Sequence, residues 1–104
     1  MGKLIDYFKT PKHVLKLIKK TKEGSWKALC EIYQIHNYYV NKVAMGYLGR
    51  GLSNGELMRL GNMGLMRAIF NWENNNKTTF ESYTQIFIRE SMLQGLARRE
   101  CDQR

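Results

Sequence analysis

The sequence has little of what divides or cross-links a chain: one proline, Pro11, and two cysteines, Cys30 and Cys101, in 104 residues. Because neither a second proline nor a Ser/Gly-rich linker appears, we expect one domain. The cysteines lie far apart without a Cys-x-x-Cys partner, which favours reduced thiols, and hence a cytoplasmic location, over a disulfide framework. His13 and His36 have no second ligand at a helical step, so no metal or other cofactor is expected.

Long apolar runs are absent and acidic side chains are scarce. No stretch approaches the roughly 20 apolar residues of a spanning helix, and the first residues lack a signal-peptide core, so no membrane partner is expected. Seventeen Lys and Arg against nine Asp and Glu give a formal net charge of +8. This excess makes a polyanion the leading class of partner, with acidic protein surfaces and anionic lipid behind it.

Helical periodicity dominates the chain and strand signals are nearly absent, which predicts an all-α fold, a compact bundle of about four helices. Ser25 is expected to cap the second helix. The stretches Ser53-Asn54-Gly55-Glu56 and Thr78-Thr79-Phe80-Glu81 are capping-box patterns that open the third and fourth helices. The predicted helices cover residues 12–21, 26–48, about 54–72 and about 79–99.

Two glycines, Gly61 and Gly64, interrupt a helix-favouring run over residues 57–72. Each interior glycine costs roughly 0.8–1.0 kcal/mol relative to alanine. At 100° per residue both fall on the side expected to face the core, where small residues let a neighbouring helix come close. A helix break at Gly61 is the competing interpretation. The other residues on this side are Leu57, Leu65, Ala68 and Trp72.

The opposite side of the same helix is also partly apolar. A lone surface helix would carry mostly charge there, so three large apolar side chains indicate a second partner. Methionine suits such a surface, because its flexible, polarisable chain adapts to another protein. The alternative is that another part of the domain, such as the first helix, covers this side. Its residues are Arg59, Asn62, Met63, Met66, Arg67 and Phe70.

The last predicted helix also has two faces. One is small enough for close packing and consists of Thr84, Ile88, Ser91, Met92 and Gly95. The other consists of Tyr83, Ile86, Glu90, Leu93 and Ala97, with Phe80 and Phe87 near the shared edge. Arg89 faces away from it, and Arg98 and Arg99 end the helix. Aromatic rings beside basic side chains suit single-stranded nucleic acid, because bases stack on the rings and cations take the phosphates. The alternative is that Phe80, Tyr83 and Phe87 are core aromatics.

A longer pattern runs through residues 38–99. It consists of "GRGL" at 49–52, Glu56-Leu57, "GN" and "GLMRA" within 61–68, Trp72, Phe80, Ser82-Tyr83 and Ile88-Arg89. This pattern resembles conserved region 2 of the bacterial sigma-70 family and keeps its spacing without gaps through the two core helices. The resemblance implies a fold like sigma domain 2 over residues 25–104, preceded by a basic helical segment over residues 1–24, within one compact domain.

The resemblance implies a transcription-initiation subunit and not an enzyme. Such a subunit docks on the clamp helices of RNA polymerase's largest subunit and recognises and melts the promoter −10 element. The implied polymerase-binding residues are Arg59, Leu60, Asn62, Met63 and Met66. The implied DNA-binding residues are Phe80, Tyr83, Ile86 and Phe87, which hold flipped non-template bases, Glu90 and Leu93, which face the upstream base pairs, and Arg89, Arg98 and Arg99.

Three departures from the family pattern stand out. Ile86-Phe87 replaces a Trp-Trp pair, Thr78-Thr79 lacks an aromatic, and Arg59-Leu60 replaces Gln-Glu, so we expect an alternative or mobile-element sigma factor. Nothing follows Arg104 to form a −35-reading helix-turn-helix, which predicts a second sigma subunit that carries one. The alternatives are a fragment of a full-length sigma factor, a regulator that occupies the clamp without opening DNA, and a general basic nucleic-acid binder.

Overall fold

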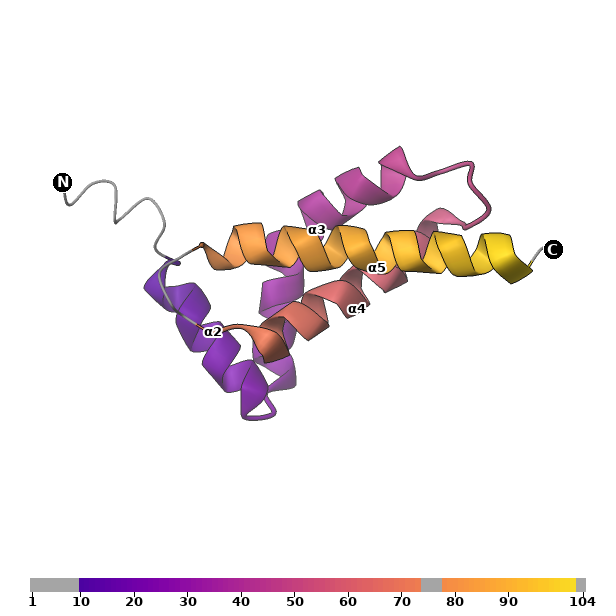
Figure 1. Ribbon diagram of the computed structural model, residues 1–104. Helices are drawn as coiled ribbons and strands as arrows, with labels where there is room; N and C mark the ends of the chain where they lie inside the picture. The colour runs from indigo at the N-terminus through magenta and orange to yellow at the C-terminus, as the bar shows by residue number, and fades with distance from the viewer. Residues whose placement is uncertain (1–9, 74–77, 103–104) are drawn as a thin grey trace.

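The computed structural model describes residues 10–73 and 78–102, and the structural statements that follow concern those residues. They form four helices and no strand, which confirms the predicted all-α four-helix bundle (Figure 1). The helices are α2 (Lys12–Lys22), α3 (Trp26–Gly46), α4 (Asn54–Asn71) and α5 (Phe80–Asp102). None of these helices is long and apolar enough to cross a membrane.

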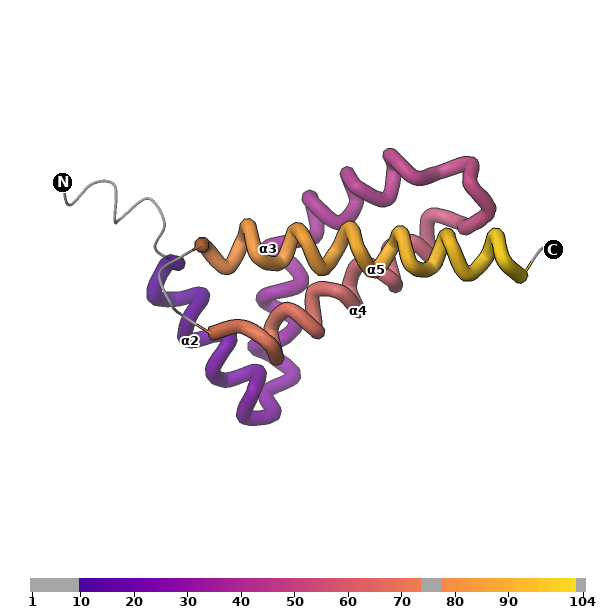
Figure 2. The backbone as a smooth tube through the Cα atoms, in the orientation of Figure 1, coloured from indigo at the N-terminus to yellow at the C-terminus, as the bar shows by residue number. Residues whose placement is uncertain are grey.

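The four helices are arranged as two pairs. A tight turn joins α2 to α3, and the long α3 then passes behind α5 to the loop that leads into α4 (Figures 1 and 2). Helices α4 and α5 run antiparallel, since Leu60 lies against Gly95 near one end and Asn71 bonds Tyr83 near the other. The two pairs are tied together at α2, because Lys22 Nζ donates to the Trp72 carbonyl at the end of α4, 2.9 Å away.

The helix boundaries follow from local capping, and all four predicted ends shift slightly. Helix α2 ends at Lys22 rather than Thr21, and α3 at Gly46 rather than Leu48. Helix α4 ends at Asn71 rather than residue 72, and α5 at Asp102 rather than Arg99. The early end of α3 reflects the loop that follows, in which Gly49 and Gly51 have φ of +86° and +112°. Only glycine adopts such angles without strain, so the helix cannot continue through them.

The predicted caps of α3 and α4 are confirmed. Ser25 Oγ accepts from the Ala28 amide at 3.2 Å. At the start of α4, Ser53 Oγ accepts from the Glu56 amide at 3.1 Å and the Ser53 amide donates to Glu56 Oε1 at 3.2 Å. Both halves of the capping box are therefore present.

The predicted Thr78–Glu81 capping box is wrong by one residue. Thr79 caps α5 instead, since its Oγ1 accepts from the Ser82 amide at 3.1 Å. The first amide of the helix, that of Phe80, donates to Thr10 Oγ1 at 2.9 Å. Starting the helix at Phe80 points its ring into the core and joins the start of α5 to the residues that precede α2.

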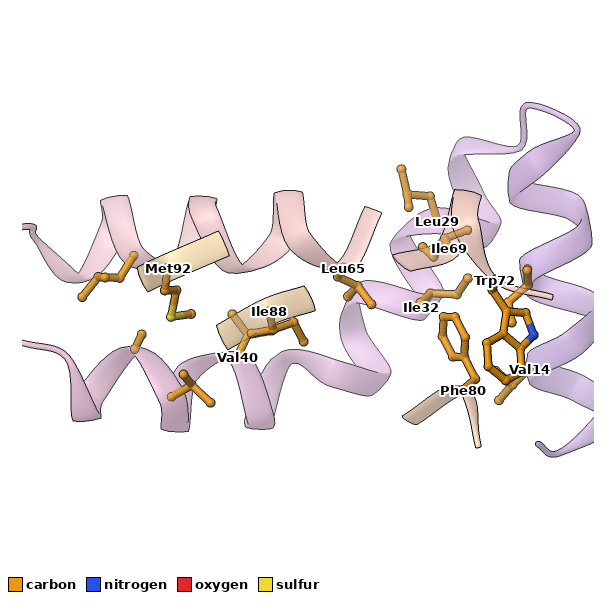
Figure 3. Packing of buried hydrophobic residues seen from close by; sticks show 14 of the residues in the cluster. Val14, Leu29, Ile32, Val40, Leu65, Ile69, Trp72, Phe80, Ile88 and Met92 are labelled. Atoms are coloured by element: carbon orange, nitrogen blue, oxygen red, sulfur yellow. The ribbon is translucent and has the colours of Figure 1, made fainter. Parts of the chain in front are cut away.

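The core is one continuous apolar cluster to which all four helices contribute. Figure 3 shows Val14, Trp72 and Phe80 at one end of the cluster and Met92 toward the other. The Phe80 ring meets the Trp72 ring edge-on at 5.5 Å between centroids, and His36 meets Phe80 in the same way at 5.7 Å. Edge-to-face pairs of this kind add to the stability gained from burial alone.

Candidate functional site

Helix α4 is continuous through both interior glycines, so the competing interpretation of a break at Gly61 is wrong. Both glycines are buried, on the side that faces the core. A Cβ at Gly61 would lie 2.6 Å from Met92 Cε, and one at Gly64 would lie 2.9 Å from Ser91 Cβ and collide with the Phe87 carbonyl. The glycines therefore set a close approach between α4 and α5, which fixes how the outer faces of the two helices sit side by side.

The outer side of α4 is open to solvent, so α2 does not cover it. Arg59 is exposed, Met63 is 49% exposed, and Asn62 and Met66 are half-buried. Arg59 Nη1 donates to Met63 Sδ at 3.4 Å, which holds the guanidinium over the thioether. The structure thus brings Arg59, Met63 and Met66 to one accessible surface, and Asn62 lies at its α3 edge, in a hollow shared with Tyr33, Gln34 and Asn37.

Leu60 is the exception among those five residues. Its side chain is half-buried and fills the space left by the missing side chain of Gly95 on α5. Packing within the domain therefore uses much of the Leu60 surface. Its predicted place on the outer face is corrected to the seam between α4 and α5.

A groove runs along this seam, with a volume of about 290 Å³. Its lining residues are Leu60, Met63, Met66 and Arg67 of α4 and Ser91, Gln94, Gly95 and Arg98 of α5. The small side chains of α5 keep the groove open, and the methionines give it an apolar floor. Sequence reasoning found the methionines but not the groove, because its second wall belongs to a different helix.

The start of α5 separates the predicted DNA-binding aromatics into core and surface residues. Phe80 is 1% exposed and lies between Trp72 and His36. Because no surface of its ring is available to a base, the predicted contact of Phe80 with DNA is corrected to a core role. The alternative of a core aromatic holds for this residue.

Tyr83 and Phe87 occupy an intermediate position at the rim of the core. The Tyr83 ring packs against Trp72 at 5.2 Å and against Phe87 at 4.9 Å between centroids. Its hydroxyl donates to the Asn71 carbonyl at 3.3 Å. Both rings are half-buried, so each is held firmly from beneath while part of it faces solvent.

The remaining α5 residues of the predicted DNA-binding set lie on the surface. Ile86 is 62% exposed and Leu93 is 46% exposed, and Glu90 and the arginines are exposed as well. Ile86 directly precedes Phe87 in the chain, so an exposed apolar side chain is followed by a half-buried ring. Arg98 and Arg99 lie about three and a half turns further along the helix.

The side chain of Arg89 reaches from α5 toward α3. Its Nε donates to Tyr39 Oη at 2.8 Å, and its guanidinium lies 5.8 Å from the centre of the Tyr39 ring. This hydrogen bond raises the pKa of Arg89 further above its usual range. Arg89 lies less than one turn after Ile86, and its side chain reaches a surface that also holds Lys42 and Tyr47.

A cavity of about 470 Å³ lies between α2, α3 and the start of α5. Its lining includes His36 and Tyr38 of α3 and Phe80 and Glu81 of α5, and Tyr38 is 79% exposed at its mouth. Its volume lies within the range of small-molecule pockets in proteins. The sequence contained only a weak signal for it, since its walls come from three separate helices.

The basic side of α2 is exposed and lies next to this cavity. Its members are Lys12, His13, Lys16, Lys19 and Lys20. Among the described residues, no group of three His, Cys, Asp or Glu side chains is placed to hold a metal ion.

No protein-family model matches the chain. The chain is similar to the RNA polymerase sigma factor SigA of Mycoplasma genitalium, with 32% identity over 99 residues that cover 92% of this chain and 19% of that protein. SigA of Mycoplasma pneumoniae gives the same values. SigA of Listeria monocytogenes is 30% identical over 81 residues, which cover 78% of this chain and 22% of that protein.

The chain spans about a fifth of the length of these relatives. The alignment with the Mycoplasma genitalium protein covers 92% of the chain, so the residues left out are fewer than those of α2. The alignment therefore extends into the residues of α2, which the resemblance over residues 38–99 did not include. Together with the α4–α5 arrangement, these alignments support a sigma-70-type region in this chain.

Proposed function

We propose that this chain is a transcription-initiation subunit of the sigma type, which binds RNA polymerase core and holds the opened promoter −10 element. The observation that carries the proposal is a pair of adjacent, chemically different surfaces on one tightly packed helix pair. The outer side of α4 is largely apolar and adaptable, whereas the start of α5 offers rings that Trp72 supports. Similarity to proteins named RNA polymerase sigma factors supports both assignments.

In this proposal the outer side of α4 docks on the clamp helices of the polymerase's largest subunit. Met63 supplies the exposed anchor, Met66 the half-buried one, and Arg59 and Asn62 the polar contacts. Methionine fits a helical partner because its side chain adjusts to the partner's ridges. Leu60 contributes indirectly, by holding α4 against α5 at Gly95.

The start of α5 then captures unpaired bases of the non-template strand. Ile86 and the free edges of Tyr83 and Phe87 provide apolar and aromatic surface for bases. The neighbouring cavity beneath Tyr38 is large enough to hold one extruded base. Glu90 and Leu93 face the duplex, and Arg89, Arg98 and Arg99 take phosphates.

No bond is made or broken in this mechanism, so the chain acts by binding and is not an enzyme. Unstacking a base costs a few kcal/mol. Stacking on an aromatic side chain returns about 1–3 kcal/mol per base, and phosphate contacts add a salt-dependent part. The open state is therefore favoured by capture of bases, with no hydrolysis to drive it. We place this activity in the cytoplasm, where the polymerase acts.

The test is transcription in vitro with core RNA polymerase from the organism that encodes the chain. The chain is added alone or with a separate −35-reading sigma subunit, and permanganate reactivity of unpaired thymines reports opening of the −10 region. We expect chain-dependent opening. Binding to core polymerase without opening under either condition would identify a regulator that only occupies the clamp, and no binding to core would remove the sigma-type assignment.

A further inference from the structure

We propose that the basic side of α2 is a second nucleic-acid surface, which binds the phosphate backbone of double-stranded DNA without regard to sequence. This contact is distinct from the base capture proposed at the start of α5, and it requires no polymerase. Three properties of α2 support it: the placement of its charges, the kind of cation that it carries and the burial of its apolar side.

The positive charge of the chain is concentrated around α2. Residues 12–27 contain six lysines and a single acidic residue, Glu23, whereas the whole chain has a net charge of +8. All six lysines are exposed. A local excess of this kind creates a positive potential that attracts a polyanion and speeds its association.

Four of these lysines form a row along the side of α2 that faces away from the core. At 100° per residue they fall within an arc of about 100°, opposite the buried Val14 and Ile18. Over the length of the row the helix rises about 12 Å. One strand of B-DNA carries a phosphate about every 3.4 Å along its axis, so the row spans several successive phosphates. The lysines of the row are Lys12, Lys16, Lys19 and Lys20.

The cations in this part of the chain are all lysines. Arginine is absent from the first 49 residues of the sequence. Lysine is a compact, hydrated point charge that meets phosphate from any direction, whereas the planar arginine fork suits paired contacts with a carboxylate or with guanine. Protein interfaces are moreover enriched in arginine and depleted of lysine. The row therefore fits a phosphate backbone better than an acidic protein surface.

The apolar side of α2 is already used by the fold. Val14 and Ile18 are buried, and Leu15 and Leu17 pack against the core. The helix therefore has no free apolar side to insert into a lipid surface. It also contains no Phe, Tyr or Trp on which an unpaired base could stack. Charge alone suits a duplex, whose bases are already stacked inside it.

The basic side of α2 lies close to the surface proposed to capture bases. Thr10 Oγ1, just before the helix, accepts from the Phe80 amide at 2.9 Å. His13 of α2 and Glu81 of α5 line the same cavity, so one carboxylate borders the lysines on this side. Figure 1 shows α2 at the end of the molecule where α5 begins. A duplex held on α2 is therefore kept next to the start of α5.

The test measures binding of the full chain to two fluorescein-labelled duplexes of unrelated sequence, by fluorescence anisotropy over a range of salt concentrations. We expect the two affinities to agree within about threefold, since phosphate contacts carry no sequence information. The triple substitution Lys12→Gln/Lys16→Gln/Lys19→Gln should weaken duplex binding at least about tenfold at low salt. It should also lower the slope of log Kd against log salt by about three, one for each phosphate contact.

Two further measurements keep the test local to α2. Lys16→Gln alone, which changes one exposed side chain, should lower the same slope by about one. A single-stranded DNA pool should lose less affinity than the duplexes in the triple variant, because the rings of α5 are intact. Glutamine resembles lysine in helix propensity, so thermal melting should match wild type in both variants.

The matched control is Lys27→Gln/Arg50→Gln/Arg67→Gln, which removes the same charge from three exposed positions outside α2. It should lower duplex affinity by less than about threefold. Equal losses in the two triple variants, no loss in the α2 variant, or a strong preference for one duplex would overturn the inference. So would displacement of the duplex by a poly-glutamate chain at equal charge, since the surface would then be a site for acidic protein.

A parallel pull-down with core polymerase separates this inference from the proposed function. If duplex binding depends on the α2 lysines but the chain does not bind core polymerase, α2 is a DNA surface and the proposed function fails. If core polymerase binds and the promoter opens while duplex affinity is the same in the α2 variant, the proposed function stands and the inference fails.

Discussion

The outer side of α4 and the start of α5 lie next to each other, yet they are built in different ways. On α4 the proposed docking surface is made of methionine and arginine, and the long side chains of Arg59 and Met63 are exposed. On α5 the rings of Tyr83 and Phe87 rest on Trp72 and on each other. The first surface can adapt to its partner, whereas the second is preorganised.

This difference follows from what each surface is proposed to bind. A helical partner varies in side-chain detail, so flexible methionines lose little by adjusting to it. A flipped base is flat and rigid, so rings that are already in place hold it without a further loss of entropy. Both surfaces depend on the close contact between α4 and α5 at Gly61 and Gly64, which fixes their relative position.

The largest loss of stability is expected at Phe80, where the start of α5 meets the core. Phe80→Ala removes a fully buried ring, and such substitutions lower the free energy of unfolding by about 3–5 kcal/mol. Chemical denaturation monitored by circular dichroism measures the change. Phe70→Ala, at an exposed phenylalanine of α4, should stay within about 0.5 kcal/mol of wild type. A small effect at Phe80 would mean that its ring is not part of the core.

The seam that the two surfaces share is tested by Gly64→Ala. The new methyl group collides with the Phe87 carbonyl, so we expect a loss of about 1–3 kcal/mol despite the better helix propensity of alanine. Gly46→Ala is the matched control, because a Cβ there has no neighbour within 4 Å. It should raise stability by up to about 1 kcal/mol. Equal gains at both sites would contradict the close approach of α4 and α5.

The preorganised surface alone is tested by Phe87→Ala. Loss of one stacking ring should lower the affinity for a fluorescein-labelled single-stranded DNA pool by about 1–3 kcal/mol, roughly 5- to 150-fold. Binding to core polymerase should not change. Trp26→Ala, which removes an exposed ring at the far end of α3, should leave DNA affinity unaltered. Equal losses in the two variants would show that the binding is not local to α5.

The smallest expected effect is a change in the pH dependence of stability, caused by Glu56 at the start of α4. Hydrogen bonding to Ser53, first through its backbone amide and then through its side chain, holds the pKa of Glu56 below its ordinary value of 4.5. Since the folded-state pKa is the lower one, the carboxylate stabilises the fold above pH about 4.5, and this stabilisation is lost as pH falls through the folded pKa. Thermal melting of Glu56→Gln should therefore depend less on pH over this range than melting of wild type. Parallel curves would contradict the capping role.

Much of this arrangement was predictable from local sequence. The periodicity of α4 placed Gly61 and Gly64 on the inner side, and the Ser53–Glu56 pattern fixed where the helix begins. Both depend on residues within a few positions of one another. The contrast between an inner face of small residues and an outer face of methionines was visible for the same reason.

What depends on contacts between distant residues was not predictable. Periodicity on α5 cannot tell a buried Phe80 from an exposed ring, because its burial depends on Trp72 and on the bond to Thr10. Likewise, the sequence predicted Leu60 at the surface, whereas in the structure its side chain packs into the space beside Gly95 of α5. Met66 is half-buried for a similar reason, which makes Met63 the cleaner position for testing the outer surface.

The most direct test of the account is the affinity of core RNA polymerase for wild type, Met63→Asp and Ile86→Ala, measured by biolayer interferometry with thermal melting of each variant. Both substitutions replace exposed side chains, one on α4 and the other on α5. We predict that Met63→Asp weakens binding more than about 30-fold, as at an interface hot spot, while Ile86→Ala binds like wild type and both melt normally. Wild-type affinity in Met63→Asp, or an equal loss in Ile86→Ala, would contradict the assignment of α4 as the docking surface.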